Sequence, residues 1–455
     1  MKHCILKHAD QPARIKPLSL LLTSAILLSL ISSLRIFFDP NGYTRFVLGH
    51  MEIIVFAVTA ICLYRGDYSK RRHYPFCLLY LLWILVTYLS RGDLNLSIDS
   101  NRVALVNQCA LCCVALPYAH FTKDSDRRYL NHILMAIISV CAILIWLCLI
   151  GTITGRDITL MDGALKFGAQ YTYTGRLKLR MLNLYYYHLG YLSVVCFFIT
   201  LYLAVSRWAA RFLPLLILML CTFAAATLLT YSRTAVFALL GGLVIVFYIP
   251  LSRSCGNKKL RMAIFLLVTL AGIAATGAGM NLLYKAVHSI RDIWYGLSSL
   301  SSRTDIWSGS LRALIAHPFC MLFGFSLDTG MATVNEFIPL SDYIAHTHNG
   351  FLQAFVFLGL PGFLFVVAFF VYLIRCCLTL FSAVHKGDVP VSVMMLVPIP
   401  AVSIFINLFE SVLLYGEPKL IILSFINALV SGYIIESSLL VRKPSAVPST
   451  GSEDA

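Results

Sequence analysis

Charged residues are scarce in this sequence. They make up 13% of its 455 residues, whereas a soluble globular domain carries about 25%. Hydrophobic residues, in contrast, make up 59% of the chain. The shortage of charge excludes an ordinary soluble protein, and the excess of apolar residues predicts an all-α integral membrane protein.

Signatures of several enzyme classes are also absent. The sequence has no Gly-rich phosphate loop of Walker type, no His and Cys cluster at zinc spacing and, in its outer loops, no paired carboxylates of glycosidase type. Most of its 14 cysteines lie in apolar segments, where cysteine acts as a small hydrophobe. Cys320 alone falls in an outer loop, so no intramolecular disulfide is expected there. We expect no metal ion, no cofactor and no nucleic-acid partner.

About twelve segments are apolar enough to span a membrane, since a spanning helix needs roughly 20 such residues. They are 17–34, 46–64, 74–90, 103–119, 133–153, 185–205, 212–230, 235–251, 262–284, 351–374, 391–413 and 419–438. No small-residue cleavage site follows the first segment, so we expect it to be retained. The predicted organisation is nine spans in 1–284, a large outer loop at 285–350, three spans in 351–440 and a disordered cytoplasmic tail at 441–455.

Lys and Arg gather in every second loop, as in the run Lys70, Arg71 and Arg72, which places both termini in the cytoplasm. This topology accounts for most of the formal net charge of +15. The two long outer loops, 154–184 and 285–350, hold basic residues that topology does not require. Among them, Arg176 and Arg180 suit either an anionic ligand or an anchor at the membrane interface.

The stretch SSRTDIWSGSLRALIAHP predicts a short amphipathic helix in the large outer loop. Its apolar residues recur near helical spacing, and Pro318 closes the pattern. Ser302 and Asp305 resemble a capping box, which predicts a helix start near Arg303. An arginine at a helix N-terminus suits a phosphate, although pairing with Asp305 or with lipid head groups would also explain it.

Four further polar residues lie at predicted outer ends of spans. Arg233, in TYSRTA, is a candidate ligand for an anion or a snorkelling arginine at a helix end. His348, in HTHNGFLQ, can take a proton from a hydroxyl, unless a backbone carbonyl satisfies it. His346 would point elsewhere on a helix, and residues two apart share no helical face, which argues against a paired-histidine metal site. Glu410 can pair with one of the arginines.

The sequence GLPG at 359–362 interrupts the tenth predicted span. Pro361 removes one helical hydrogen bond, so we expect a kink there. A kink can turn the histidine end of the span toward a cavity or can serve packing alone.

In order and spacing, Arg233 in TYSRTA, Arg303 in SSRTDIW and His348 in HTHNGFLQAFVFLGLPG resemble the bacterial O-antigen ligase and polymerase superfamily. The resemblance covers roughly residues 212–374. It implies a GT-C-like glycosyltransferase of the bacterial inner membrane with a periplasmic site. It also implies that Arg233 and Arg303 hold a diphosphate and that His348 is the base or orients the acceptor. We count Arg176, Arg180, Glu410, His346 and Asn349 as further substrate-binding candidates.

The partners implied by the resemblance are a donor glycan on undecaprenyl diphosphate, a lipid A-core oligosaccharide as acceptor, and membrane lipids. A polymerase would instead use a second lipid-linked repeat unit as acceptor. A transporter or flippase is the third hypothesis. Such a protein should carry polar groups near the membrane midplane and consist of two related halves. The candidate residues gather at one interface instead, which favours an enzyme.

Overall fold

The computed structural model describes residues 73–91, 111–116, 127–154, 158–160, 165–171, 177–181, 186–206, 211–230, 232–254, 291–326, 330–339, 346–386, 389–410 and 421–442, with the single residues 108, 118 and 344. The predicted spans at 17–34, 46–64 and 262–284, most of 103–119 and nearly all of the tail lie outside these residues. The prediction of twelve spans therefore stays a prediction.

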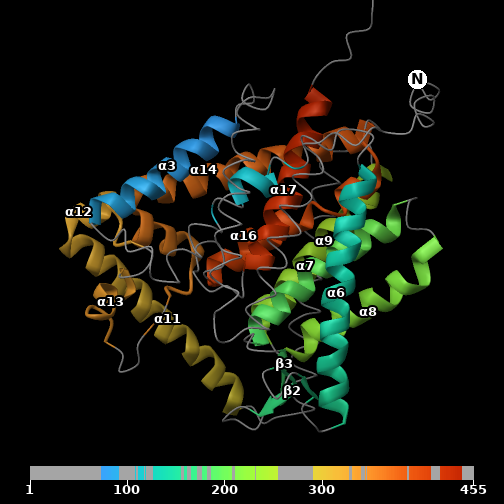
Figure 1. Ribbon diagram of the computed structural model, residues 1–455, viewed down its shortest axis with the longest axis horizontal. Coiled ribbons are helices and arrows are strands. Elements are labelled where there is room, and N and C mark those ends of the chain that lie inside the picture. The colour runs from blue at the N-terminus through green and yellow to red at the C-terminus, as the bar shows by residue number, and fades with distance from the viewer. Residues whose placement is uncertain are drawn as a thin grey trace, which may run out of the picture.

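The described part is a bundle of apolar helices (Figure 1). Its long helices are α3 (His73–Arg91), α6 (Arg127–Ile153), α7 (Tyr186–Val205), α8 (Leu213–Leu229), α9 (Arg233–Ser254), α14 (Gly350–Lys386), α16 (Pro398–Phe409) and α17 (Ile421–Arg442). Each overlaps a predicted span. Five segments are long and apolar enough to cross a membrane: Leu130–Gly151, His188–Val205, Gly350–Val384, Val391–Phe409 and Leu423–Val441. The chain is thus an integral membrane protein.

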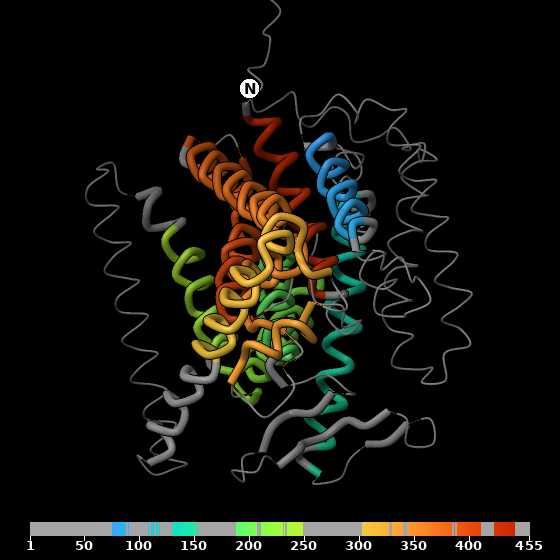
Figure 2. Tube along the Cα trace, turned by 90° about the vertical axis from the view of Figure 1, so that its left-hand side faces the viewer, coloured from blue at the N-terminus to red at the C-terminus, as the bar shows by residue number. Residues whose placement is uncertain are grey.

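Five further helical elements belong to the described part. They are the π-helix η2 (Leu111–Ala115) and the helices α11 (Arg291–Ala316), α12 (Pro318–Phe323), α13 (Gly330–Asn335) and α15 (Val391–Met394). The segment from α11 to α13 lies along one side of the bundle, as Figure 1 and Figure 2 both show. This segment carries one of the predicted site residues, Arg303, to the bundle.

The outer surface of the bundle is apolar. Ile143 on α6 is 61% exposed, Ile217 on α8 is 51% exposed and Leu378 on α14 is 62% exposed. Exposed apolar surface of this extent marks contact with a membrane or a partner. In helices of this hydropathy, we assign it to lipid.

The prediction of an all-α protein is wrong for one segment. Strands β1 (Ile158–Leu160), β2 (Leu165–Tyr171) and β3 (Leu177–Met181) form an antiparallel sheet in the order β1-β2-β3, in which Gly168 pairs with Arg180. The sheet lies beside α6 (Figure 1). The sequence LKLRM alternates apolar and basic residues, and this period of two is typical of a strand rather than a helix.

The predicted kink in α14 is confirmed, with its centre at Gly359. The backbone of Gly359 has φ 68° and ψ −171°, a region that only glycine adopts readily. Pro361 follows it and cannot donate to the helix. Carbonyls just before the kink instead accept from outside the helix: Val356 from the Phe325 N–H at 2.7 Å and Leu358 from the Trp83 indole at 2.8 Å.

The kink fits against the end of α12. A Cβ on Gly359 would lie 2.1 Å from the Leu322 carbonyl oxygen. Gly324 likewise has a positive φ, of 77°, and a Cβ on it would lie 2.1 Å from the Phe357 carbonyl oxygen. Two backbones therefore touch where two glycines meet. This contact fixes α12, which follows α11, against α14. Helix α14 begins just after the predicted base His348.

Gly359→Ala is expected to destabilise the protein by at least about 2 kcal/mol, because a Cβ disfavours positive φ and would collide with the Leu322 backbone. Thermal unfolding in detergent measures this. Gly241→Ala on α9 is the matched control, since a Cβ there meets nothing within 4 Å. Equal unfolding temperatures for the two variants would contradict the account of the kink.

Candidate active site

Helix α11 starts earlier than the sequence predicted. It runs from Arg291 to Ala316, so Arg303 lies in its middle and not in a first turn. The capping box of Ser302 and Asp305 is therefore wrong, and the charge of the helix N-terminus does not act at Arg303. The predicted close at Pro318 is right, because α11 ends at Ala316 and α12 begins with the proline.

One face of α11 turns Arg303 toward the bundle. Ile306, Ser310 and Leu314 are buried and continue this face at helical spacing. Trp307, one turn after Arg303, donates its indole N–H to the carbonyl of Thr347 at 2.9 Å. This bond ties α11 to the turn that precedes α14.

That turn, residues 346–349, holds His348 in an unusual backbone conformation. His348 has φ 52°, the left-handed region, which a side-chain-bearing residue seldom adopts. The neighbouring Thr347 fixes it, because its N–H and its hydroxyl both donate to Gln353, at 2.7 and 2.9 Å. Backbone outliers held by surrounding bonds cluster at functional sites.

Asn349 is the cap of α14. Its side-chain oxygen accepts from the N–H groups of Phe351 and Leu352, at 3.0 and 2.9 Å, as capping residues do. Its amide nitrogen donates to the carbonyl of Leu408 at 3.1 Å. Predicted as a substrate ligand, Asn349 here joins the start of α14 to the end of α16.

The end of α16 brings Glu410 to the histidine turn. Gly350 allows this approach, because a Cβ there would lie 2.2 Å from the Asn407 side-chain oxygen. Glu410 is the residue at which α16 stops, and its N–H donates to the Ile406 carbonyl at 2.8 Å. A carboxylate is unfavourable at the negative end of a helix, and burial adds to this cost, so Glu410 requires cationic or hydrogen-bond-donating partners.

Both oxygens of Glu410 have such partners. Oε1 accepts from Nη2 of Arg303 at 2.7 Å, and Oε2 lies 3.1 Å from Nδ1 of His348. The Glu410 side chain is 8% exposed, while those of Arg303 and His348 are 24% and 28% exposed. An ion pair with Arg303 and a hydrogen bond with the His348 ring thus share one carboxylate. The pairing of Glu410 with an arginine is as predicted.

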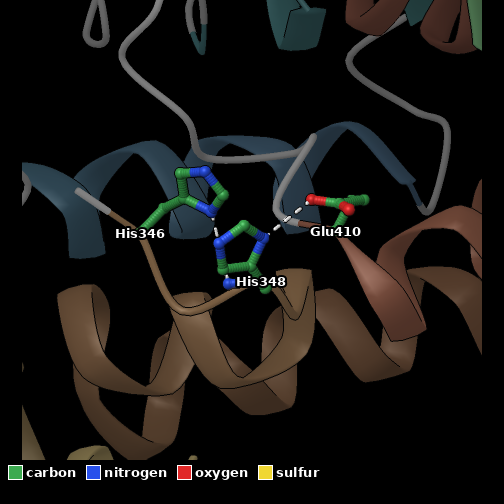
Figure 3. A group of neighbouring side chains, drawn as sticks. All are labelled: His346, His348 and Glu410. Carbon is green, nitrogen blue, oxygen red and sulfur yellow. Dashed lines mark hydrogen bonds and ion pairs between the residues drawn. The ribbon is translucent and has the colours of Figure 1, made fainter. Parts of the chain in front are cut away.

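His346 belongs to the same cluster, contrary to the expectation that it points away. Its ring centroid lies 4.0 Å from that of His348, and its Nδ1 accepts from the backbone N–H of His348 at 3.3 Å (Figure 3). The expectation assumed a helix, but residues 346–349 form a turn. Burial, and then the charges of His348, His188 and Arg303, lower the pKa of His346 to about 3, so its imidazole is neutral at physiological pH.

The cluster also has the donors for a metal ion. His346, His348 and Glu410 each offer one ligand atom, all within 4.8 Å of one another. The argument that two histidines two residues apart cannot share a metal fails here, since it applies only to a helix. In this geometry, however, Glu410 is already neutralised by Arg303 at 2.7 Å and hydrogen-bonded to His348.

The other predicted arginines are placed only through their backbones. Arg233 opens α9, directly after Ser232, whose hydroxyl caps the helix by accepting from the Ala235 N–H at 3.4 Å. Arg180 lies on β3 opposite Gly168. Arg176 lies outside the described residues.

Two residues of α7 that lie near the cluster, Tyr191 and His188, were not predicted as site residues from the sequence. The charges of Glu410 and Arg303 act on the Tyr191 hydroxyl, which also interacts with Ser232 and Thr234 at the start of α9. The charge of the second residue, His188, is one of the causes that lower the pKa of His346. Their signal was the polar run LYYYHLGY at the start of an apolar span. Through Tyr191, the helix that Arg233 opens lies close to the cluster.

Comparison with known proteins gives one family. The family model described as O-antigen ligase matches residues 217–367, which include Arg303, the kink of α14 and the histidine turn. No curated protein matches the chain.

Proposed function

Residues 217–367 belong to the O-antigen ligase family, and on this premise we propose that the protein transfers O-antigen polysaccharide from undecaprenyl diphosphate to a hydroxyl of lipid A-core oligosaccharide. The family itself indicates a membrane enzyme of the glycosyltransferase kind with ligase-like or polymerase-like activity. The observation that carries the proposal is the convergence of Arg303 and His348 on Glu410. A cation suited to a diphosphate and a base suited to a hydroxyl then stand side by side.

In the proposed reaction, the acceptor hydroxyl oxygen attacks the anomeric carbon of the donor glycan. The bond from this carbon to the diphosphate oxygen breaks, and its electron pair leaves with undecaprenyl diphosphate. His348 takes the proton of the hydroxyl. General base catalysis of this kind contributes about 10²- to 10⁴-fold.

Arginines stabilise the leaving group in this proposal. Negative charge develops on the diphosphate as the bond breaks, so a fixed guanidinium favours the transition state over the ground state. Arg303 is 24% exposed and keeps N–H donors beyond the one that Glu410 uses. Arg233 acts with it, and Arg176 and Arg180 are candidates for the diphosphate or for phosphates of the core. We propose that no metal ion is required, because the arginines supply the positive charge.

We place the site at the periplasmic face of the bacterial inner membrane, with both termini in the cytoplasm. The segment 285–350 is then the periplasmic loop, and α11 is its helix. The exposed Leu311 and Ile315 on α11, at 46% and 67%, face membrane lipid in this arrangement, while Ile306 and Leu314 pack inward.

A polymerase that joins lipid-linked repeat units would use the same groups, and the family supports it as the alternative. A transporter or flippase is the weaker alternative. Arg303, His348 and Glu410 meet at one end of α16 and α14, whereas a transporter is expected to carry polar groups near the midplane.

Deletion of the gene distinguishes these functions. For a ligase, we expect lipopolysaccharide with a complete core and no attached polymer, and polymer accumulating on the lipid carrier. The measurement is a gel profile of lipopolysaccharide together with analysis of the carrier lipids. A core capped with a single repeat unit would contradict the ligase and indicate the polymerase, and an unchanged profile would contradict both.

A further inference from the structure

Glu410 uses both of its carboxylate oxygens at the candidate site, one for each of the two groups that the proposed chemistry needs. We propose that Glu410 is a positioning residue: it fixes the protonation pattern of the His348 ring and holds that ring at a set distance from the Arg303 guanidinium. The inference rests on the proposed function.

The contact with His348 decides which ring nitrogen can act as base. An ionised carboxylate only accepts hydrogen bonds. Nδ1 of His348, 3.1 Å from Oε2, therefore carries the proton, and Nε2 keeps its lone pair. Figure 3 shows the His348 ring with Glu410 on one side and His346 on the other.

The contact with Arg303 decides where the diphosphate sits. Oε1 accepts from Nη2 at 2.7 Å, and the remaining guanidinium N–H groups are free to face a phosphate without breaking this bond. Leaving group and base are then joined through one side chain that is 8% exposed and anchored at the end of α16. Holding reacting groups in a fixed arrangement lowers the entropy lost in the reaction.

A glutamine at position 410 cannot replace these contacts. Its amide has one oxygen and one NH₂ group. The NH₂ group must therefore face either His348 or Arg303, and both of these donate a hydrogen bond to Glu410 in the proposed arrangement. If the NH₂ group faces His348, Nδ1 must accept and Nε2 carries the proton, which removes the base. If it faces Arg303, two donors meet and the guanidinium loses its anchor. In serine proteases, replacing the aspartate that orients the catalytic histidine by asparagine imposes the wrong histidine tautomer and lowers kcat about 10⁴-fold.

The test uses the purified full-length protein in lipid, with a lipid diphosphate-linked glycan as donor and rough lipopolysaccharide as acceptor. We expect Glu410→Gln to lower kcat at least 100-fold with an unchanged unfolding temperature, and Glu410→Asp to recover part of the rate. In a His348→Ala background, Glu410→Gln should cause a much smaller loss than in the wild type, because its effect on the base is already absent and only its effect on Arg303 remains. Glu436→Gln, at another buried glutamate, on α17, is the matched control and should transfer normally.

A kcat for Glu410→Gln within threefold of the wild type would overturn the inference. So would losses that multiply in the double variant, or a loss that follows a lowered unfolding temperature in both Glu410→Gln and Glu410→Asp. Absence of transfer by the wild-type protein would instead contradict the proposed function, so the two failures are distinguishable.

Discussion

His348→Ala is expected to lower the transfer rate by about 10²- to 10⁴-fold, the contribution of a general base, while the protein still inserts and unfolds at nearly the same temperature. The side chain bonds to Glu410 and is 28% exposed, so little packing is lost. The rate of glycan transfer in lipid, at saturating donor and acceptor, is the measurement. A rate within threefold of the wild type would remove His348 from the mechanism.

Two controls separate loss of the base from other causes. His348→Asn tests the backbone, because asparagine tolerates the left-handed conformation found at φ 52°, and it should be as inactive as His348→Ala. His317→Ala removes an exposed imidazole at the start of α12 that packs against Phe325 and Phe337. It should transfer normally.

The metal-binding geometry of the cluster gives a third control. If His346, His348 and Glu410 held a required metal ion, a chelator would inhibit the wild type and a divalent ion would restore it. We expect no inhibition, because the arginines neutralise the diphosphate in the proposed reaction. Inhibition that a divalent ion reverses would contradict the metal-free mechanism while leaving the glycosyl transfer itself in place.

Arg303→Ala is expected to lower kcat/KM by roughly 30- to 4,000-fold, since truncating one partner of a buried charge pair costs about 2–5 kcal/mol. The lower end of this range is expected because Arg303 is 24% exposed. The variant loses a donor to the diphosphate and also leaves Glu410, 8% exposed, without its cation. Kinetics with varied donor concentration give the effect.

Arg303→Lys and Arg312→Ala sharpen this test. Lysine keeps the charge but not the planar set of donors, so Arg303→Lys should recover a part of the activity only. Arg312 is exposed on the same helix, with Nε 3.4 Å from the Ser308 carbonyl, and its removal should change little. Equal losses for Arg303→Ala and Arg312→Ala would show a general charge effect on α11 in place of a specific site.

Much of the site was predictable because its residue types conflict with their surroundings. A histidine, an arginine and a glutamate are costly at the edges of apolar helices, so Arg303, His348 and Glu410 stood out individually. The pairing of Glu410 with an arginine followed from charge alone. The kink of α14 followed from GLPG, because proline and glycine act through the local backbone.

The wrong predictions share a cause. The start of α11 was placed at a capping pattern, but serine and aspartate also occur within helices that other contacts stabilise, and α11 is held by its buried face and by Trp307. His346 was assigned to a helical face, although Thr347 and Gln353 bond the segment into a turn. The strands near Arg180 were overlooked within an otherwise helical chain.

The sequence by itself determined the membrane class, the helical segments and the identity of the reactive groups, because hydropathy, charge and local backbone restriction are properties of neighbouring residues. Only the tertiary structure decided that Arg303 on α11, His348 before α14 and Glu410 at the end of α16 meet. Arg303 and Glu410 are separated by 107 residues, and no local preference spans that distance. Backbone contacts at Gly324 and Gly359, and the close approach of Gly350 to the Asn407 side chain, bring these helices together. The buried carboxylate is stable there because its partners converge on it.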